Sequence, residues 1–256
     1  MESESEHHID TFDDTGDPAV PEAPWLRTPR KPRERAPLSR EIIVDAALRL
    51  LDREGAAAFS MRRLAEELGV GAGAVYWHVA NKEQLLQLVF DRVIGQLPMP
   101  EPDPERWREQ IKTAARDERD MMRRHPGIAQ LSFGRIPVGP NAVRYMEWHL
   151  SILRSGRLSD RVAALAGDLI YLYIGAFSYE ECLGIALPTD GDATVHDFIG
   201  QLRDYFASLP ADRFPNISQL AVELTSGGHD VRFDFGLDVL LDGLVARSHE
   251  DDGVSR

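Results

Sequence analysis

The chain has 256 residues, of which 43% are hydrophobic and 28% charged, and its formal net charge is −13. This length allows one large domain or two small ones, with a sizeable core. A single cysteine, Cys182, excludes an internal disulfide and a metal site built from several thiolates. No run of 18 apolar residues occurs and the acidic N-terminus is the opposite of a signal peptide, so we expect a cytoplasmic protein without a membrane partner.

The charge is distributed unevenly along the chain. Residues 1–26 contain eight acidic side chains and no Lys or Arg, and residues 97–256 carry a net charge of −8. Residues 27–96 contain twelve basic and nine acidic side chains and form the only positive block. A positive block in an acidic chain is typical of a nucleic-acid-binding region, so we expect this block to face nucleic acid.

Residues 1–37 are predicted to form a disordered acidic tail followed by a basic arm. Low hydrophobicity and many like charges disfavour a folded core up to about residue 28. Between residues 27 and 40, six basic side chains oppose a single acid, and three prolines keep the backbone extended. Such an arm, which includes Arg33 and Arg35, can lie in the minor groove of DNA; the alternative is a solubilising linker.

Residues 60–80 predict two short helices joined by a tight turn. Ser60 is a natural N-cap for the first helix, and Gly69 ends that helix at a position where a positive φ costs little. The second helix is expected over about residues 71–79, with Val75 on its inward side. A small residue at Ala65, a glycine at 69 and a branched residue at 75 let two helices approach, reverse and pack, as a helix-turn-helix requires.

Two longer helices flank this pair. Ser39 caps a predicted first helix that Gly55 ends, and Asn81 caps a fourth helix that extends to about Leu97. The fourth helix is apolar on more than one side, so we expect it to contact both the DNA-binding helices and the domain behind them. Prolines at 98, 100, 102 and 104 then mark a boundary, which places a DNA-binding domain at residues 38–97.

Residues 104–247 predict a second, larger domain that is also helical. Its helices are expected at residues 105–124, 126–133, 140–155, 159–184, 195–209 and 231–247, and residues 248–256 are expected to be a disordered tail. Helices 159–184 and 231–247 are apolar on two sides, a surplus that a monomer would leave exposed. We therefore expect a homodimer in which these two helices of each copy form a four-helix bundle.

The run from Ser60 to Lys82, with Tyr76-Trp77-His78-Val79 and Asn81-Lys82, resembles the DNA-binding domain of the TetR (tetracycline-repressor) family of bacterial transcription regulators. The resemblance covers residues 38–95 and returns at residues 233–244, which are similar to the last helix of a tetracycline-repressor-like C-terminal domain. It implies an all-α protein with an N-terminal three-helix helix-turn-helix DNA-binding domain and a larger helical ligand-binding and dimerisation domain.

The resemblance also implies a function. A dimer would bind a palindromic double-stranded DNA operator through the second helix of each motif. A small-molecule effector, expected to be apolar, would bind the C-terminal domain and release the DNA by tilting the helix at residues 81–97. We expect no metal and no other cofactor.

Carried over by position, Tyr76, His78 and Lys82 match family residues that touch the DNA backbone, and Arg62 matches a base reader that can bind guanine bidentately. Trp77 either contacts DNA or packs inside the domain. The predicted DNA-binding set is Ser60, Met61, Arg62, Ala72, Gly73, Ala74, Tyr76, Trp77, His78 and Lys82, together with Arg33 and Arg35 of the arm. Because residues 71–74 offer no polar side chain, we expect specificity to depend on Arg62, the arm and DNA shape.

Candidate ligand-binding residues are large or polar side chains on helix faces expected to point inward, and core packing is the alternative for each. They are Trp107, Glu118, Met121, Met122, Phe133, Met146, His149, Tyr173 and Phe177. Two positions at which the tetracycline repressor uses a metal-binding His and a hydrogen-bonding Asn hold Ser132 and Ala114, which speaks against a magnesium–tetracycline ligand. Methionine and aromatic residues suit an apolar, bulky effector instead.

Two other classes of protein remain as alternatives. Glycines 69, 71 and 73 look like a phosphate-binding loop of a nucleotide-binding enzyme, but the segment before them is a charged amphipathic helix rather than a strand. No hydrolase, zinc-protease or Walker motif occurs, so an enzyme is disfavoured. The second alternative is a helical DNA-binding regulator without a small-molecule ligand.

Overall fold

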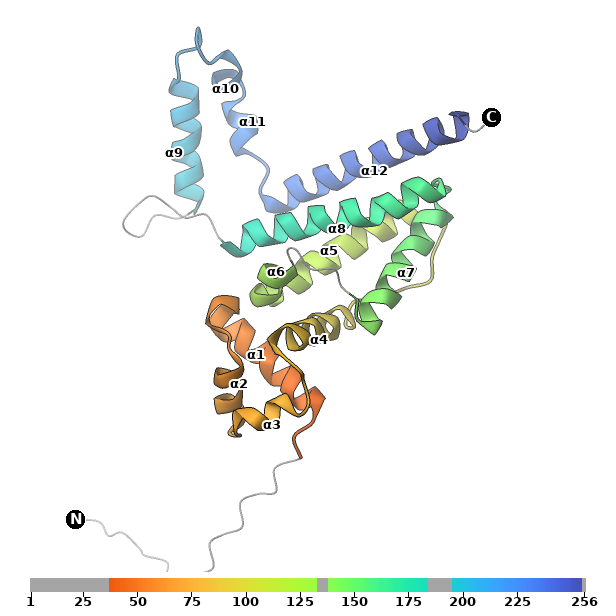
Figure 1. Cartoon of the computed structure of the whole chain (residues 1–256). Coiled ribbons are helices and arrows are strands. Elements are labelled where there is room, and N and C mark those ends of the chain that lie inside the picture. Colours follow the sequence, from red (N-terminus) through yellow and green to blue (C-terminus); the bar gives the residue numbers. More distant parts are fainter. Residues whose placement is uncertain (1–36, 133–137, 184–194, 255–256) are drawn as a thin grey trace, which may run out of the picture. The chain divides into compact units, whose positions relative to one another are not determined.

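A computed structural model describes residues 37–132, 138–183 and 195–254 (Figure 1). Every regular element within these ranges is a helix, which confirms the expected all-α class. The tail and arm with Arg33 and Arg35, and the ligand candidate Phe133, lie outside the described residues.

The first four helices form one packed unit, here called the head. They are α1 (Arg40–Ala58), α2 (Met61–Leu68), α3 (Ala72–Tyr76) and α4 (Lys82–Ile94). Their interior is apolar, with Leu50, Leu64, Val75, Leu85 and Val89 fully buried. The burial of one stripe from each helix is what holds these short elements together.

The predicted capping residues start the head helices. The Ser60 hydroxyl accepts a hydrogen bond from the Arg63 amide at 3.2 Å, and Asn81 Oδ1 accepts one from the Gln84 amide at 2.8 Å. Ser39 Oγ accepts one from the Ile42 amide at 3.3 Å. Gly69 ends α2 in the left-handed conformation, with φ of 65°.

Two head helices differ from the prediction in length. Gly55 breaks the helical geometry of α1 with a φ of 78°, but a further turn continues to Ala58. α3 is shorter than expected and ends at Tyr76, after which Trp77 and His78 form a turn. α3 has no side-chain cap and contains Gly73 in its interior, so little local free energy favours a longer helix.

The remaining helices form what is here called the body. They are α5 (Trp107–Arg124), α6 (Pro126–Ser132), α7 (Pro140–Ser155), α8 (Asp160–Leu183), α9 (Val195–Ser208), α10 (Pro215–Gln219), α11 (Ala221–Thr225) and α12 (His229–Val254). α8 is long and apolar enough to cross a membrane by length and composition alone. It packs against α5, α6, α7 and α12, as the core helix of a globular domain does.

The predicted disordered tail at residues 248–256 is corrected as far as Val254, because α12 continues to that residue; residues 255 and 256 lie outside the described residues. Ser248 is buried, and its hydroxyl accepts a hydrogen bond from the Ser159 amide at 2.7 Å. This contact at the start of α8 ties the extension of α12 to the body. The sequence analysis also did not find α10 and α11.

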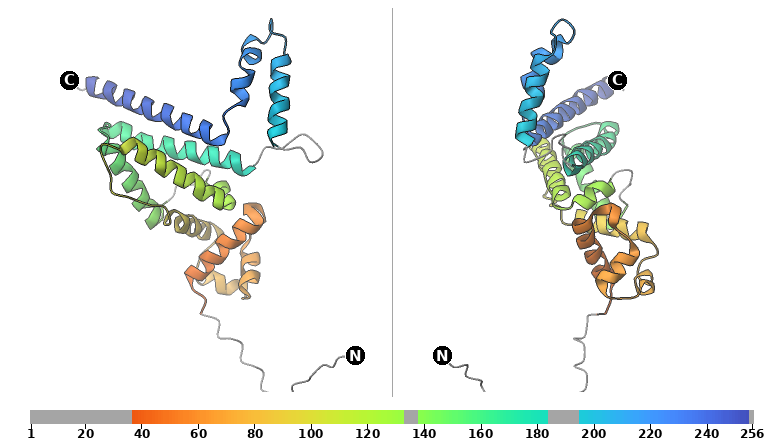
Figure 2. Two further views of the ribbon diagram at one scale, coloured as in Figure 1. Left: turned by 180° about the vertical axis from the view of Figure 1, so that it is seen from behind. Right: turned by 90° about the vertical axis from the view of Figure 1, so that its left-hand side faces the viewer.

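α9, α10 and α11 form a helical hairpin that packs mainly on itself (Figure 2). Its exposed apolar side chains are Tyr205, Phe214, Ile217, Leu220, Val222 and Leu224. Other exposed apolar side chains follow one stripe of α8 (Leu165, Leu169 and Leu172) and one stripe of α12 (Val231, Phe235 and Val239). Such surfaces are uncommon on a monomer.

Candidate DNA-binding surface and ligand cavity

The turn after α2 and the short helix α3 form an exposed surface with small residues at its start and aromatic residues at its end. Ala72 and Gly73 are exposed, and Ala74 and His78 are half-buried. Tyr76 is 49% exposed and Trp77 is 89% exposed. Packing inside the head therefore does not explain why position 77 holds a tryptophan, because this residue lies almost entirely in solvent.

Three predicted DNA-binding residues have other roles in the free chain. Met61 is buried in the core of the head, which corrects its assignment to the DNA-binding surface: as the first residue of α2 it lies on the inward stripe. Lys82 Nζ donates a hydrogen bond to the Phe59 carbonyl at 2.7 Å and lies over the Phe59 ring at 5.4 Å. Ser60 caps α2 through its side chain.

Arg62 is the most exposed of the basic side chains on α2. Its Nε lies 3.1 Å from Glu66 Oε1, one turn further along the helix, and the arginine side chain is 88% exposed. An exposed pair of this kind contributes little to stability and exchanges readily for a phosphate or a base. The neighbouring Arg63 pairs with Glu54 of α1 at 3.0 Å, which holds it against the head.

Gly71 and Gly73 have open space around them. A Cβ added at either position would meet no atom within 4 Å, and neither residue has a φ in the left-handed region. Packing inside the head therefore does not require a glycine at either position.

The body contains a buried polar cluster formed by Glu118 on α5 and by Tyr145 and His149 on α7. The exposed fractions of these residues are 6%, 8% and 8%. His149 Nε2 lies 3.6 Å from Glu118 Oε1, too far for a hydrogen bond. The Tyr145 hydroxyl lies close to Glu118, yet among the described residues neither it nor His149 Nε2 has a hydrogen bond of acceptable geometry.

Burial dominates the protonation of this cluster. It raises the pKa of Glu118 to about 7, with the neighbouring Asp117 adding to the rise and Tyr145 opposing it. Burial also lowers the pKa of His149 to about 4, so its imidazole is neutral at physiological pH. The pKa of the Tyr145 hydroxyl is raised by burial and by Glu118. Within the described residues, the cluster thus offers a hydroxyl and a neutral imidazole nitrogen without hydrogen-bond partners, beside a buried carboxyl group. Buried polar groups without partners are uncommon.

A cavity of about 550 Å³ lies beside the cluster, between α5, α7 and the loop that joins α4 to α5. Trp148 forms part of its wall, and its indole Nε1 donates a hydrogen bond to the Pro100 carbonyl at 2.6 Å. The same ring lies 5.3 Å, between ring centroids, from both Tyr145 and His149. Trp148 therefore stands between the open cavity and the buried polar cluster.

The predicted ligand candidates fall into separate places. Glu118 and His149 belong to the cluster, and Met121 and Met122 are buried on the same helix as Glu118. Trp107 packs so closely on Gly156 that a Cβ there would lie 2.5 Å from its ring.

Met146 corrects the prediction that it points inward, because it is 55% exposed. The buried face of α7 instead carries Ala142, Tyr145, His149, Ile152 and Leu153. Tyr145 and Trp148 were not among the predicted residues. Tyr145 lies four residues before His149, and this spacing places both on one face of the helix, so it was a readable signal for Tyr145.

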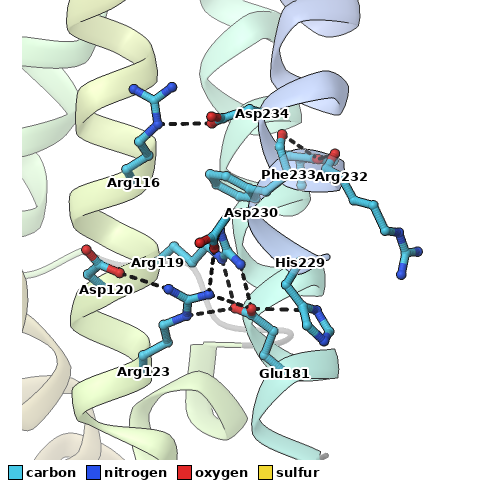
Figure 3. A network of polar contacts seen from close by, with 11 residues as sticks. Arg116, Arg119, Asp120, Arg123, Glu181, His229, Asp230, Arg232, Phe233 and Asp234 are labelled. Carbon is cyan, nitrogen blue, oxygen red and sulfur yellow. Dashed lines mark hydrogen bonds and ion pairs between the residues drawn. The ribbon is translucent and has the colours of Figure 1, made fainter. Parts of the chain in front are cut away.

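A second cluster is centred on Glu181 of α8 and Arg119 of α5 (Figure 3). The rings of Tyr173 and Phe177 lie 5.9 Å apart, between centroids, beside this cluster. The Arg119 guanidinium lies 5.0 Å from the Phe177 ring and 4.5 Å from the Phe233 ring. Glu181 accepts hydrogen bonds from Arg119 at 2.5 and 2.8 Å and from Arg123 at 2.8 Å. Burial alone would raise the pKa of Glu181, but the two arginines outweigh it and lower the pKa to about 2.

The second cluster continues along α5 and α12 as a ladder of ion pairs. Arg116 pairs with Asp234 at 2.9 Å, Lys112 with Asp238 at 2.7 Å and Arg108 with Asp242 at 2.6 Å. Residues four apart lie on one side of a helix, so the basic residues of α5 face the acidic residues of α12. The ladder occupies one side of α12 and leaves Phe235 and Val239 exposed on another.

Comparison with known proteins gives concordant matches. The family described as "Bacterial regulatory proteins, tetR family" matches residues 43–89, and that described as "Tetracyclin repressor-like, C-terminal domain" matches residues 99–248. An HTH-type transcriptional regulator of Saccharopolyspora erythraea is 31% identical over 230 residues, which are 89% of this chain and 93% of the relative. The HTH-type transcriptional repressor DrrR1 of Streptomyces coeruleorubidus is 33% identical over 85% of this chain and 80% of its own.

Solved structures of the TetR family protein ActR from Streptomyces coelicolor are also similar. Apo ActR is 41% identical with a TM-score of 0.77, over 85% of this chain and 99% of its own. ActR in complex with actinorhodin is 42% identical with a TM-score of 0.77, over 85% of this chain and all of its own. Regulators of this family bind DNA operators and small-molecule effectors and are generally dimeric. The chain belongs to the tetracycline-repressor (TetR) family and is a ligand-responsive, DNA-binding transcriptional regulator.

Proposed function

We propose that the chain is a cytoplasmic repressor that binds a palindromic operator as a homodimer and releases it when a flat, largely apolar molecule enters the body. The observation that carries this proposal is the buried cluster of Glu118, Tyr145 and His149 beside a cavity of about 550 Å³. Buried donors and acceptors without partners are costly, and a ligand that supplies the missing hydrogen bonds repays that cost.

The chemistry of the site defines the ligand. Neutral His149 and the Tyr145 hydroxyl suit hydroxyl or carbonyl groups on a ring system, while the Trp148 indole offers a flat apolar surface. ActR has been solved with actinorhodin and with (S)-DNPA, which makes actinorhodin the first compound to test with this chain. Ala114 lines the cavity and cannot hydrogen-bond through its side chain, in keeping with an effector other than magnesium–tetracycline.

The proposed DNA contacts come from the exposed surface of α2 and α3. Arg62 reads a base, Tyr76, Trp77 and His78 contact the sugar–phosphate backbone, and Ala72, Gly73 and Ala74 bring the helix close to the major groove. Lys82 reaches a phosphate only by leaving the Phe59 carbonyl, so its contribution to affinity is reduced by the loss of that bond. Arg33 and Arg35 of the arm remain candidates for minor-groove contacts.

The proposed dimer interface consists of the exposed stripes of α8 and α12. Leu165 and Leu172 are 61% and 54% exposed, and Phe235 and Val239 are 70% and 55% exposed. Pairing these stripes across a two-fold axis buries them in a four-helix bundle and sets the two heads at a fixed spacing. This supports the homodimer expected from the helices at residues 159–184 and 231–247.

The experiment first uses the purified full chain to select bound duplexes from a random DNA library. Fluorescence anisotropy titrations then measure the affinity for the selected duplex. We expect a palindromic site, release of that site by actinorhodin, and no release by magnesium–tetracycline. Arg62→Ala should weaken DNA binding by roughly 1–3 kcal/mol and relax the preference at one base position. Arg92→Ala is the control, because Arg92 pairs with Asp45 of the same head, and it should not change base preference. A site without two-fold symmetry would contradict the dimer, and DNA binding that no hydrophobic compound releases would contradict the ligand response.

A further inference from the structure

α7 begins without a capping side chain of its own. Its N-cap residue is Gly139 and its first helical residue is Pro140, so the free amides of its first turn need an acceptor from elsewhere. Asp91 of α4, a helix of the head, supplies that acceptor. Asp91 Oδ1 accepts a hydrogen bond from the Ala142 amide at 2.9 Å, the bond that an N-cap side chain normally makes.

A second contact joins the same two helices. The Asn141 side-chain Nδ2 donates to Asp91 Oδ2 at 3.1 Å and to the Asp91 carbonyl at 3.2 Å. Asp91 is 7% exposed, so these bonds are shielded from water, and its negative charge lies at the positive end of the α7 dipole.

Two glycines leave room for this junction. A Cβ at Gly139 would overlap the Asp91 carboxyl group, and a Cβ at Gly95 would lie 2.8 Å from the Asn141 side chain. The close approach of α4 and α7 is therefore built into the sequence at both helices, and a side chain at either position would push them apart.

The junction lies between the two binding regions. Ala142, Tyr145 and His149 are on the same buried face of α7, so the residue that Asp91 caps and the residues of the polar cluster move together. At its other end α4 begins directly after the turn that follows α3, and Lys82 ties that end to Phe59. The part of α4 from Lys82 to Asp91 is continuous helix and links Asp91 rigidly to the DNA-binding surface.

We propose that Asp91 is the positioning residue that couples the ligand cavity to the DNA-binding head, by capping α7 from α4. A ligand that shifts α7 at Tyr145 and His149 moves the α7 N-terminus, and Asp91 transmits that movement to α4 and α3. A second attachment of the head lies elsewhere, where Asp52 of α1 contacts His125 at 2.8 Å and Gly127 of α6 packs on Leu51. With α1 held there, displacement at Asp91 tilts α4 rather than moving the whole head.

This inference rests on the proposed function, and its test compares operator affinity with and without saturating actinorhodin in the full chain. In Asp91→Asn, the affinity for operator alone and the affinity for actinorhodin alone should each stay within about threefold of wild type. The ratio of the operator affinity without actinorhodin to that with saturating actinorhodin should fall at least tenfold, towards one. Asp45→Asn is the matched control, because the ion pair of Asp45 with Arg92 stays within the head, and it should keep the wild-type ratio. The exchanged pair Asp91→Asn with Asn141→Asp should restore part of the ratio.

Hydrogen exchange provides a readout without a ligand. The Ala142 amide should exchange at least tenfold faster in Asp91→Ala than in wild type, and operator binding should alter exchange at residues 139–145 in wild type but not in Asp91→Ala. An unchanged affinity ratio in Asp91→Asn, or equal Ala142 exchange in both proteins, would overturn the inference. If wild type did not respond to actinorhodin, or bound no duplex, the proposed function would be contradicted instead. The exchange rate of the Ala142 amide would then still test whether Asp91 caps α7.

Discussion

Two glutamates on neighbouring helices of the body have opposite environments. Glu118 on α5 is buried beside Tyr145 and His149 without a basic partner, and its pKa rises to about 7. Glu181 on α8 is nearly as buried, but it accepts hydrogen bonds from Arg119 and Arg123, and its pKa falls to about 2. The same side chain is thus kept partly neutral in one place and fully ionised in the other.

From this difference in environment we infer that the Glu181 cluster is structural and that the Glu118 cluster belongs to the proposed ligand-binding site. At Glu181 the carboxylate is paired with Arg119 and Arg123, and the cluster joins α5, α8 and α12. Beside Glu118, the Tyr145 hydroxyl and His149 Nε2 lack hydrogen-bond partners among the described residues, and Trp148 stands between them and a cavity. Buried polar groups without partners mark functional sites more often than structural ones.

The largest expected effect comes from removing the charge of Glu181. Glu181→Gln leaves Arg119, whose side chain is 4% exposed, without its principal partner, so the free energy of unfolding should fall by roughly 3 kcal/mol. Because the pKa of Glu181 is lowered from 4.5 to about 2, this difference should be complete above pH 4.5 and shrink as the pH falls towards 2. Urea unfolding measures it, with the exposed neighbour Glu180→Gln as control. Equal losses in the two variants would show that Glu181 is not the centre of the cluster.

Glu118→Gln should raise the free energy of unfolding at high pH, whereas Glu181→Gln should lower it. The native pKa of about 7 lies above the unfolded value of 4.5, so wild type loses stability as the pH rises from 4.5 to 7 and the variant does not. At pH 8 the variant should be more stable by up to roughly 3 kcal/mol, and near pH 4.5 the two should be similar. Unfolding at both pH values tests this, with exposed Glu109→Gln as control. A stability difference that does not depend on pH would argue against a buried, unpaired carboxyl group.

A smaller effect is expected for the Tyr145 hydroxyl. Because that hydroxyl has no hydrogen bond in the part of the chain that the structure describes, Tyr145→Phe should change the free energy of unfolding by less than about 0.5 kcal/mol. Its affinity for actinorhodin should fall roughly tenfold, or about 1.4 kcal/mol, if the hydroxyl binds the ligand. Calorimetric titration measures the affinity, and Tyr205→Phe is the control because Tyr205 is 59% exposed. If Tyr145→Phe lost stability but kept its affinity for actinorhodin, the hydroxyl would be a structural group and not a ligand-binding one.

The smallest effect is expected at the outer end of the ion-pair ladder. Asp242 pairs with Arg108 at 2.6 Å, but its side chain is 70% exposed. Asp242→Asn should therefore lower the free energy of unfolding by no more than about 0.5 kcal/mol, and 1 M NaCl should remove most of that difference. Urea titrations at low and high salt measure this. A loss as large as that of Glu181→Gln would mean that the whole ladder acts as one cooperative unit.

The head was predictable because its signals are local. Ser39, Ser60 and Asn81 cap helices that begin one residue later, and Gly69 ends α2 with the expected positive φ. Such signals depend on neighbours within four residues, so they survive any tertiary arrangement. The bounds of α7 were also correct, since Gly139-Pro140 and Gly156 punctuate it at both ends.

The ligand site was predicted only in part, for a physical reason. α7 has apolar residues on two sides, so its sequence does not show which side is buried; Met146 and His149 were both predicted to point inward, although only His149 lies on the buried side. The partnership of Arg119 with Glu181 joins residues 62 positions apart, which no local pattern can show. The acidic residues spaced by four on α12 were readable, but their basic partners become evident only when α5 lies beside it.

The open space around Gly71 and Gly73 has a practical consequence. Because a methyl group or a longer side chain at either position points away from the head, new residues can be introduced there without repacking its interior. The regulator is thus a convenient scaffold for engineering altered operator preference: libraries at these two positions would sample new base contacts while the effector response of the body stays intact.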